Sequence, residues 1–240
     1  MKILAVDSSS ITASVAVVEN GVILGETFIN SGLTHSQTIS PMIESILFNL
    51  KASAEEIDLF AVTNGPGSFT GLRIGVATVE GLSLASQKPC IGVSSLEALA
   101  FGASGRYSII CACMDARRGQ VYNALFEKRD KALTRLTGDR TVSIKSLDQE
   151  LQKINSDIEF VGDGASMCYN NIESLIKAEK CVLSEEKNRY IRASSVAFLA
   201  ERKYKGFDEK YNINVDINYI NIPQAQRLLE KNLKKEDEDI

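Results

Sequence analysis

The sequence predicts an α/β protein made of a duplicated unit, in two lobes that each open with a three-stranded β-meander followed by alternating helices and strands. Three observations lead to this prediction. The 240 residues are 44% hydrophobic and 24% charged, which is an average composition for a folded, water-soluble protein. Apolar runs with strand periodicity alternate with runs of helical periodicity. The order of these runs then begins again near residue 107.

The first half begins with three short apolar and β-branched runs. Asn20-Gly21 separates the second run from the third, and Asn-Gly between two such runs is the strongest short hairpin signal. Residues 36–51 carry apolar side chains at the spacing of one helix face. Ser94 or Ser95 is expected to cap a helix. The predicted strands are 2–6, 14–18, 22–29, 59–63 and 89–93, and the predicted helices are 36–51, 71–86 and 95–101.

The second half repeats this order. Asp115 ends its first strand as Asp7 ends the first strand of the chain. We therefore expect a lobe at residues 1–103, a second lobe at 104–222 and a charged tail at 223–240, with chance coincidence of the two orders as the alternative. The predicted strands are 107–114, 120–126, 133–137, 159–161 and 181–183, and the predicted helices are 146–154, 165–177 and 194–205.

Composition excludes several classes of function. Lys and Arg number 27 against 31 Asp and Glu, a net charge of −4, so tight binding of nucleic acid by this chain alone is not expected. The single histidine, His35, cannot supply a two-histidine metal site, and five cysteines without a CxxC indicate neither a disulfide framework nor a zinc knuckle. No apolar run reaches the ~20 residues that cross a bilayer, and no signal peptide opens the chain, so we expect a cytoplasmic protein without membrane association.

Residues 64–71 join a predicted strand to a predicted helix and contain three glycines. Backbone amides at a helix N-terminus can hold an anion, so the segment could bind a phosphate. The glycine spacing is one residue longer than the dinucleotide fingerprint, and no lysine follows as in a P-loop. A structural turn capped by Ser68 or Thr70 is the favoured interpretation.

A duplicated α/β unit with an aspartate at each hairpin tip is similar to the architecture of actin, hexokinase and Hsp70, where two such aspartates face a nucleotide between the halves. By that resemblance a vestigial nucleotide cleft is expected, although neither hairpin loop contains the glycines that let amides approach phosphate. No metal site and no catalytic residue are expected. The cleft candidates are Asp7, Ser8, Ser9, Asp115, Gly162 and Gly164.

A catalytic triad can also be assembled on paper from Ser68, His35 and Asp7. No nucleophile-elbow motif surrounds Ser68, which argues against this hydrolase alternative.

The predicted helix 71–86 is apolar or small on nearly every side. Its only charged residues, Arg73 and Glu80, lie seven positions apart on one stripe, which we expect to stay solvated or to make contacts at the rim of an interface. Such a helix is buried on more than one side, either as a central core helix or because its second face packs on another chain. On the second interpretation the interface candidates, here and on the helix 36–51, are Met42, Ile46, Arg73, Ala77, Glu80, Gly81 and Ala85.

Two stretches resemble one family. Residues 64–100, NGPGSFTGLRIGVATVEGLSLASQKPCIGVSSLEALA, are similar to the long signature of the TsaB (YeaZ) family, and residues 114–122, MDARRGQVY, are similar to its second signature. The opening ILAVDSSSITASVAVV, His35 and Pro41 also match. The family's late Tyr-x-Arg and Glu-Ala-Glu pattern is present here only as Tyr219-Ile220-Asn221 and Gln224-Ala225-Gln226.

The resemblance implies a non-catalytic, actin-like subunit of the bacterial machinery that adds a threonylcarbamoyl group to adenosine 37 of tRNAs reading codons that begin with A. It implies dimerisation with the catalytic paralogue TsaD, association with the ATPase TsaE, homodimerisation when alone, and no cofactor of its own. The alternatives are an actin-like ATPase or sugar-kinase relative, and the peptidase suggested by the older family label of glycoprotease.

Overall fold

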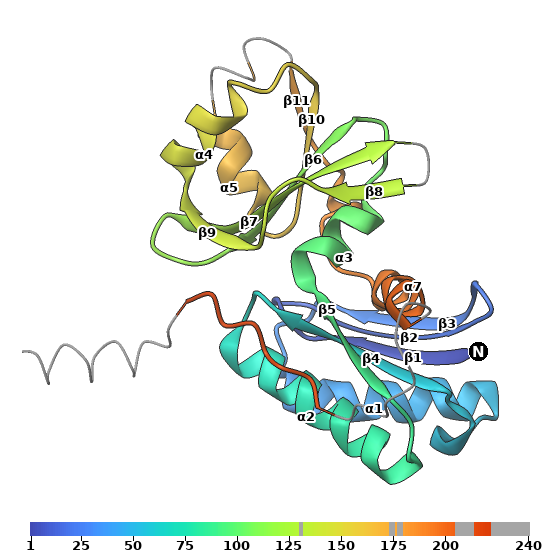
Figure 1. Ribbon diagram of the computed structural model, residues 1–240. Helices are drawn as coiled ribbons and strands as arrows, with labels where there is room; N and C mark the ends of the chain where they lie inside the picture. Colours follow the sequence, from blue (N-terminus) through green and yellow to red (C-terminus); the bar gives the residue numbers. More distant parts are fainter. Residues whose placement is uncertain (130–131, 173–175, 177–179, 205–213, 222–240) are drawn as a thin grey trace, which may run out of the picture.

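The computed structural model describes residues 1–129, 132–172, 176, 180–204 and 214–221, which form two lobes stacked one above the other (Figure 1). The first half contains β1 (Lys2–Asp7), β2 (Ala13–Glu19), β3 (Val22–Ile29), α1 (His35–Leu50), η1 (Ala54–Glu56), β4 (Leu59–Gly65), α2 (Phe69–Ser86), β5 (Cys90–Ser94) and α3 (Ser95–Gly102). The second half contains β6 (Ile109–Asp115), β7 (Gln120–Arg129), β8 (Ala132–Arg135), β9 (Arg140–Ser143), α4 (Ile144–Leu151), β10 (Ile158–Val161), α5 (Ala165–Asn170), β11 (Cys181–Leu183), η2 (Glu186–Asn188) and α7 (Ala193–Tyr204).

The two sheets have the same topology. The first has the order β3-β2-β1-β4-β5 and the second the order β8-β7-β6-β10-β11, with β9 added beside β7. In both, the opening three strands are antiparallel and the last two are parallel to the first strand. Agreement of order and direction over five strands excludes chance coincidence. The predicted duplicated actin- and Hsp70-like α/β fold is confirmed.

The central strands of the first sheet, β1, β2 and β4, are buried on both faces. Along β1, Leu4 and Val6 face the core beneath α1 and α2, and Ile3 and Ala5 face the opposite core. This alternation follows from the two-residue period of a strand. Asn20 and Gly21, at φ of 49° and 81°, form the predicted hairpin turn between β2 and β3.

The last helix of each half packs on the sheet of the other half. Figure 1 shows α7 on the face of the first sheet opposite α1 and α2, and α3 between the two lobes. In the first core cluster, Leu96 and Leu99 of α3 and Val196 and Leu199 of α7 pack together with residues of both sheets. A shared apolar core of this kind restricts hinge motion between the lobes. The division of the chain at residue 103 stays a prediction, since α3 and α7 cross over from the half that contains them.

Several element boundaries differ from the predictions. Within residues 165–177, helix α5 ends at Asn170, residue 176 is again helical, and 173–175 and 177 lie outside the described residues. The strand β9 was missed because its four residues show no clear alternation, and it is held by pairing with β7. Helix α4 begins two residues early because the Ser143 hydroxyl accepts a bond from the Ser146 amide. Lys205, Ile222 and the predicted tail 223–240 lie outside the described residues.

Candidate functional site

The β1–β2 loop packs directly on the glycine loop that precedes α2. The Ser68 amide donates to the Ser9 carbonyl oxygen at 2.7 Å, and the Ser8 hydroxyl donates to the Gly71 carbonyl oxygen at 2.9 Å. A Cβ atom at Gly67 would overlap the Ser9 carbonyl oxygen, and one at Gly71 would overlap that of Ser8. The glycines therefore permit backbone contact between two segments of the same lobe. The Ser68 hydroxyl caps α2, as the structural-turn interpretation predicts.

Asp7 is turned into the lobe. Its Oδ1 accepts hydrogen bonds from the Ser9 amide, from the Ser9 hydroxyl and from the Thr63 hydroxyl, the last two at 2.7 Å. Asp7, Ser8 and Ser9 are all fully buried, and Asp7 Oδ2 has no hydrogen-bond partner among the described residues. Burial raises the pKa of Asp7, and the three donated bonds oppose that rise. A carboxylate held this way differs from the exposed metal-holding aspartate that the actin resemblance suggests.

The second lobe repeats this packing with different residues. A Cβ at Gly162, where φ is +110°, would overlap the Cys113 carbonyl oxygen, and one at Gly164 would lie 3.0 Å from the Asp115 amide nitrogen. The Asp115 amide donates to Asp163 Oδ1 at 3.1 Å. Burial, with the nearby Asp115 charge as a lesser cause, raises the pKa of Asp163 to about 6. Gly162 and Gly164 thus allow a tight turn beside Asp115.

A cavity of about 510 Å³ lies between the two hairpin tips. Ser9 reaches it from the first lobe and Asp115 and Asp163 reach it from the second, but Asp7, Ser8, Gly162 and Gly164 do not line it. Of the two tip aspartates, only Asp115 faces the space between the lobes. The pair of Asp7 and Asp115 that the nucleotide-cleft prediction placed there does not line this cavity.

His35 takes no part in a triad. Its Nε2 lies 2.8 Å from the Ser10 carbonyl oxygen, while Ser68 caps α2 and the Asp7 carboxylate is bonded to Ser9 and Thr63. Among the described residues, no group of three or more His, Cys, Asp or Glu side chains is arranged to hold a metal ion.

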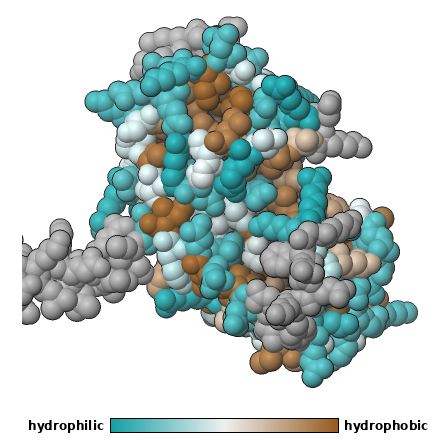
Figure 2. Space-filling view, in the orientation of Figure 1, coloured by the Kyte–Doolittle hydropathy of each residue, from teal (hydrophilic) through white to brown (hydrophobic). Residues whose placement is uncertain are grey.

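The α2 face turned away from the sheet carries small side chains at the surface. Ala77, Gly81 and Ala85 are exposed, and a Cβ at Gly81 would meet no atom within 4 Å. Leu84 on the same helix is 62% exposed. Figure 2 shows hydrophobic residues at the lower edge of the molecule, where Figure 1 places α2, as well as on the upper lobe.

The α1 candidates require a correction. Met42 and Ile46 are only 3% and 5% exposed because they pack in the core between α1 and the first sheet, where Ile46 covers Gly25. Their side chains are therefore core residues and do not form the α1 surface. Phe48, which is 81% exposed, is the large apolar side chain that α1 presents to solvent. Its position off the apolar stripe of residues 39–50 is the sequence signal that places it at the surface.

That Arg73 and Glu80 stay solvated or lie at the rim of an interface remains a prediction: Arg73 is exposed and Glu80 is half-buried, and both have partners within the chain. Residues 214–221, which we call the C-terminal strap, run along α2 and use both of them (Figure 1). Glu80 Oε1 accepts from the Val215 amide at 2.7 Å, and Arg73 Nε donates to the Tyr219 hydroxyl at 2.8 Å. The Phe69 and Tyr219 ring centroids are 4.9 Å apart, and Arg73 lies 3.9 Å above the Phe69 ring. Arg73 and Glu80 therefore each have a hydrogen-bond partner in the strap.

The strap was not predicted because residues 206–222 were placed in the second lobe without an assigned helix or strand. Val215, Ile217 and Tyr219 alternate with Asp216 and Asn218, which is the two-residue period of an extended segment with one face inward. That alternation was the available signal.

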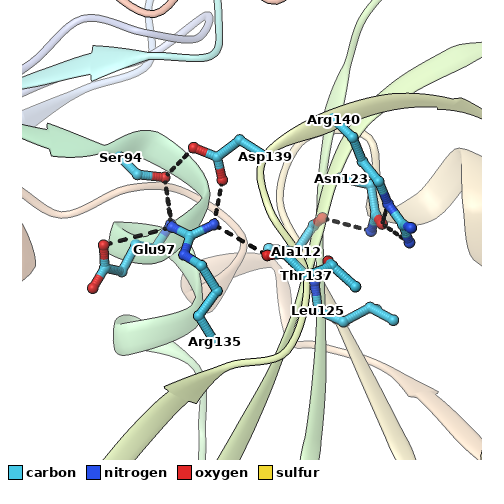
Figure 3. A network of polar contacts seen from close by, with 9 residues as sticks. All are labelled: Ser94, Glu97, Ala112, Asn123, Leu125, Arg135, Thr137, Asp139 and Arg140. Carbon is cyan, nitrogen blue, oxygen red and sulfur yellow. Dashed lines mark hydrogen bonds and ion pairs between the residues drawn. The ribbon is translucent and has the colours of Figure 1, made fainter.

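A polar network joins the two lobes at the start of α3 (Figure 3). The Ser94 hydroxyl donates to Asp139 at 2.8 Å, and Arg135 contacts Ser94, Asp139 and Glu97. Ser94 also caps α3, as predicted. Its bond with Arg135 therefore holds the end of β5 and the start of α3 against β8. Beside it, Asn123 donates to the Ala112 carbonyl oxygen and accepts from Arg140, all within the second sheet.

Within the part of the chain that the structure describes, no helix combines the length and the apolar character that crossing a bilayer would need.

Comparisons with known proteins agree with this architecture. Residues 29–234 match the family described as TsaD, tRNA N6-adenosine threonylcarbamoyltransferase. The tRNA threonylcarbamoyladenosine biosynthesis protein TsaB of Bacillus subtilis is 31% identical over 85% of this chain and 88% of its own length. TsaB of Escherichia coli is 33% identical over 68% of this chain and 72% of its own.

Among solved structures, YeaZ from Pseudomonas aeruginosa superposes with a TM-score of 0.71 at 24% identity, over 86% of this chain and 94% of that one. This likeness shows the fold. The sequence identity over most of both chains, together with the duplicated topology, places the chain in the TsaB (YeaZ) family of tRNA threonylcarbamoyladenosine biosynthesis proteins.

Proposed function

We propose that this chain is a non-catalytic subunit of the complex that makes threonylcarbamoyladenosine in tRNA, and that it acts by docking its α1–α2 side on the catalytic paralogue TsaD. Joint binding of the ATPase TsaE, and pairing with a second copy when TsaD is absent, belong to the same proposal. A cytoplasmic location is part of it, since the tRNA substrate is there.

The observation that supports docking most directly is the open α2 surface. Gly81 and Ala77 have no bulk to keep a partner helix at a distance, and Leu84 on α2 and Phe48 on α1 supply exposed apolar area. Burial of apolar area contributes roughly 25 cal/mol per Å², less the entropic cost of association. Of the seven interface candidates, Ala77, Gly81 and Ala85 stay in the proposal as contact residues.

The burial of Asp7 supports the non-catalytic assignment. An ATPase of this architecture needs its first-lobe aspartate and amides free to meet a metal and phosphates. Here Asp7 is bonded to Ser9 and Thr63, and the loop that follows it is packed on Gly67 and Gly71. The vestigial cleft with Asp115 is therefore proposed to have no role in phosphate chemistry.

Co-purification and reconstitution test this proposal. The tagged full-length chain, expressed with TsaD from the same genome, is expected to retain TsaD on the affinity resin, and tRNA modification by TsaD and TsaE is expected to require the chain. Asp7→Asn and Asp115→Asn variants should support modification at the wild-type rate. Modification by TsaD and TsaE without the chain would contradict the proposal. Loss of modification in either variant, together with ATP turnover by the isolated wild type, would favour the ATPase alternative.

A further inference from the structure

The C-terminal strap lies in a groove whose shape the first lobe provides. Asn64 makes two hydrogen bonds to the strap. Its Nδ2 donates to the Asp216 carbonyl oxygen at 2.9 Å, and its own carbonyl oxygen accepts from the Asn218 amide at 2.7 Å. These bonds are made to strap backbone, so they fix an extended conformation. With the bond from the Val215 amide to Glu80, three backbone groups of the strap are satisfied by residues of β4 and α2.

Two glycines make room for this segment. A Cβ at Gly92 would lie 2.8 Å from Val215 Cγ1, and a Cβ at Gly65 would lie 2.6 Å from the Asn218 carbonyl oxygen. Val215 is only 8% exposed and belongs to the core beneath the first sheet. The groove is thus formed by the same 64–92 stretch that carries α2.

Helix α2 depends on contacts along its flanks. Gly71, Gly75 and Gly81 lie within its 18 residues, and a glycine in a helix interior is less favourable than alanine. Gly71 and Gly75 are needed where α2 approaches Ser8. The strap holds the flank of this weak helix at two positions, Arg73 and Glu80, two turns apart.

The exposed face lies next to that flank. Ala77 is one turn from both Arg73 and Glu80, and Gly81 follows Glu80 directly. A change in the mobility of α2 at Arg73 and Glu80 therefore also changes the mobility of the adjacent exposed face. A partner helix would pack on that face.

We propose that the seated strap stiffens α2 and thereby sets the affinity of the α2 face for its partner, so that the strap is a regulatory element of the docking surface. The partner's identity rests on the proposed function above, whereas the stiffening of α2 is a property of this chain alone. The strap also reaches the second lobe, where the Thr141 hydroxyl donates to Asn221 Oδ1 at 3.2 Å. Release of the strap would thus alter the wall of the interlobe cavity, which Tyr219 and Asn221 line.

Hydrogen exchange on the full-length chain tests the stiffening. Tyr219→Ala removes the ring stack and the acceptor for Arg73, and Val215→Ser is a second variant that weakens the buried anchor. In each, the strap amides of Val215 and Asn218 and the α2 amides between residues 73 and 80 are expected to exchange at least about tenfold faster, with unchanged circular dichroism. Asp216→Ala is the matched control, because the groove binds the carbonyl oxygen of Asp216 and the substitution keeps it.

The proposal is overturned if the strap amides exchange faster while α2 is unchanged, or if neither variant releases the strap. The second arm measures binding of TsaD by calorimetry, with about tenfold weaker binding expected for Tyr219→Ala and wild-type binding for Asp216→Ala. Wild-type affinity in a strap-released variant would overturn the regulatory role alone. Failure of the wild-type chain to bind TsaD, with the exchange result intact, would instead overturn the proposed function.

Discussion

The Ser8 hydroxyl donates a hydrogen bond to the Gly71 carbonyl oxygen, and the Ser8 backbone lies where a side chain at position 71 would begin. This one contact joins the first hairpin loop to the start of α2. It explains why a glycine-rich segment that resembles a phosphate loop is occupied by the protein's own backbone. The conformational freedom of glycine serves packing here.

Replacing Gly71 tests this packing. Gly71→Ala is expected to destabilise the protein by about 1–3 kcal/mol, because the new methyl group overlaps the Ser8 carbonyl oxygen. Gly81→Ala is the matched control on the same helix; its methyl group meets open space, so it should stabilise by roughly 0.5–1 kcal/mol. Urea unfolding followed by circular dichroism measures both. Equal stability of the two variants would show that the Ser8 contact is loose.

Asp163 should make stability depend on pH. The pKa of Asp163 is raised from 3.8 to about 6, so the folded state binds its proton more tightly than the unfolded state does. The resulting stabilisation is complete below about pH 4 and is lost as the pH rises through about 6. Asp163→Asn keeps an acceptor for the Asp115 amide and removes the buried charge. At pH 7.5 this variant should be about 1–3 kcal/mol more stable than the wild type, and at pH 4 nearly equal to it.

Unfolding curves of both proteins at pH 4, 6 and 7.5 measure that difference. A gap that is constant with pH would mean that the Asp163 carboxyl keeps an ordinary pKa.

Arg135 should contribute to the contact between the lobes. Arg135→Ala removes bonds to Ser94 and Asp139 and the cation above the Phe126 ring, so a loss of about 1–2 kcal/mol in the free energy of unfolding is expected. Arg129→Ala, which removes an exposed pair with Glu127, is the control and should change stability by less than about 0.5 kcal/mol. Thermal unfolding of the two variants under one buffer condition is the measurement. If both variants lose the same free energy of unfolding, the network in Figure 3 does not stabilise the contact between the lobes.

The sequence predicted what depends on short-range pattern. The Asn20-Gly21 hairpin, the helix beginning near His35 and the Ser94 cap each follow from residues within one turn of one another, and the structure has all three. Repetition of element order was sufficient to predict the duplicated fold. Asp115 lines the cavity between the halves, and its role toward a nucleotide stays a prediction.

The features that could not be predicted depend on contacts between distant parts of the chain. The bond between Arg73 and Tyr219 was not predicted, because the two residues are 146 positions apart. Met42 was assigned to an interface because an apolar helix stripe has the same pattern whether it meets another chain or the sheet of its own lobe. The inward turn of Asp7 depends on Thr63, whose place beside β1 is decided by the parallel pairing of β4.

The measurement that tests the central claim most directly is the affinity of Gly81 variants for TsaD by isothermal titration calorimetry. Gly81→Leu should fold normally, since nothing surrounds its Cβ, and should weaken binding by at least about tenfold because overpacking an interface typically costs 1–3 kcal/mol. The control is Arg129→Ala in the other lobe, which should bind as the wild type does. Wild-type affinity for a folded Gly81→Leu variant would contradict docking through the α2 face.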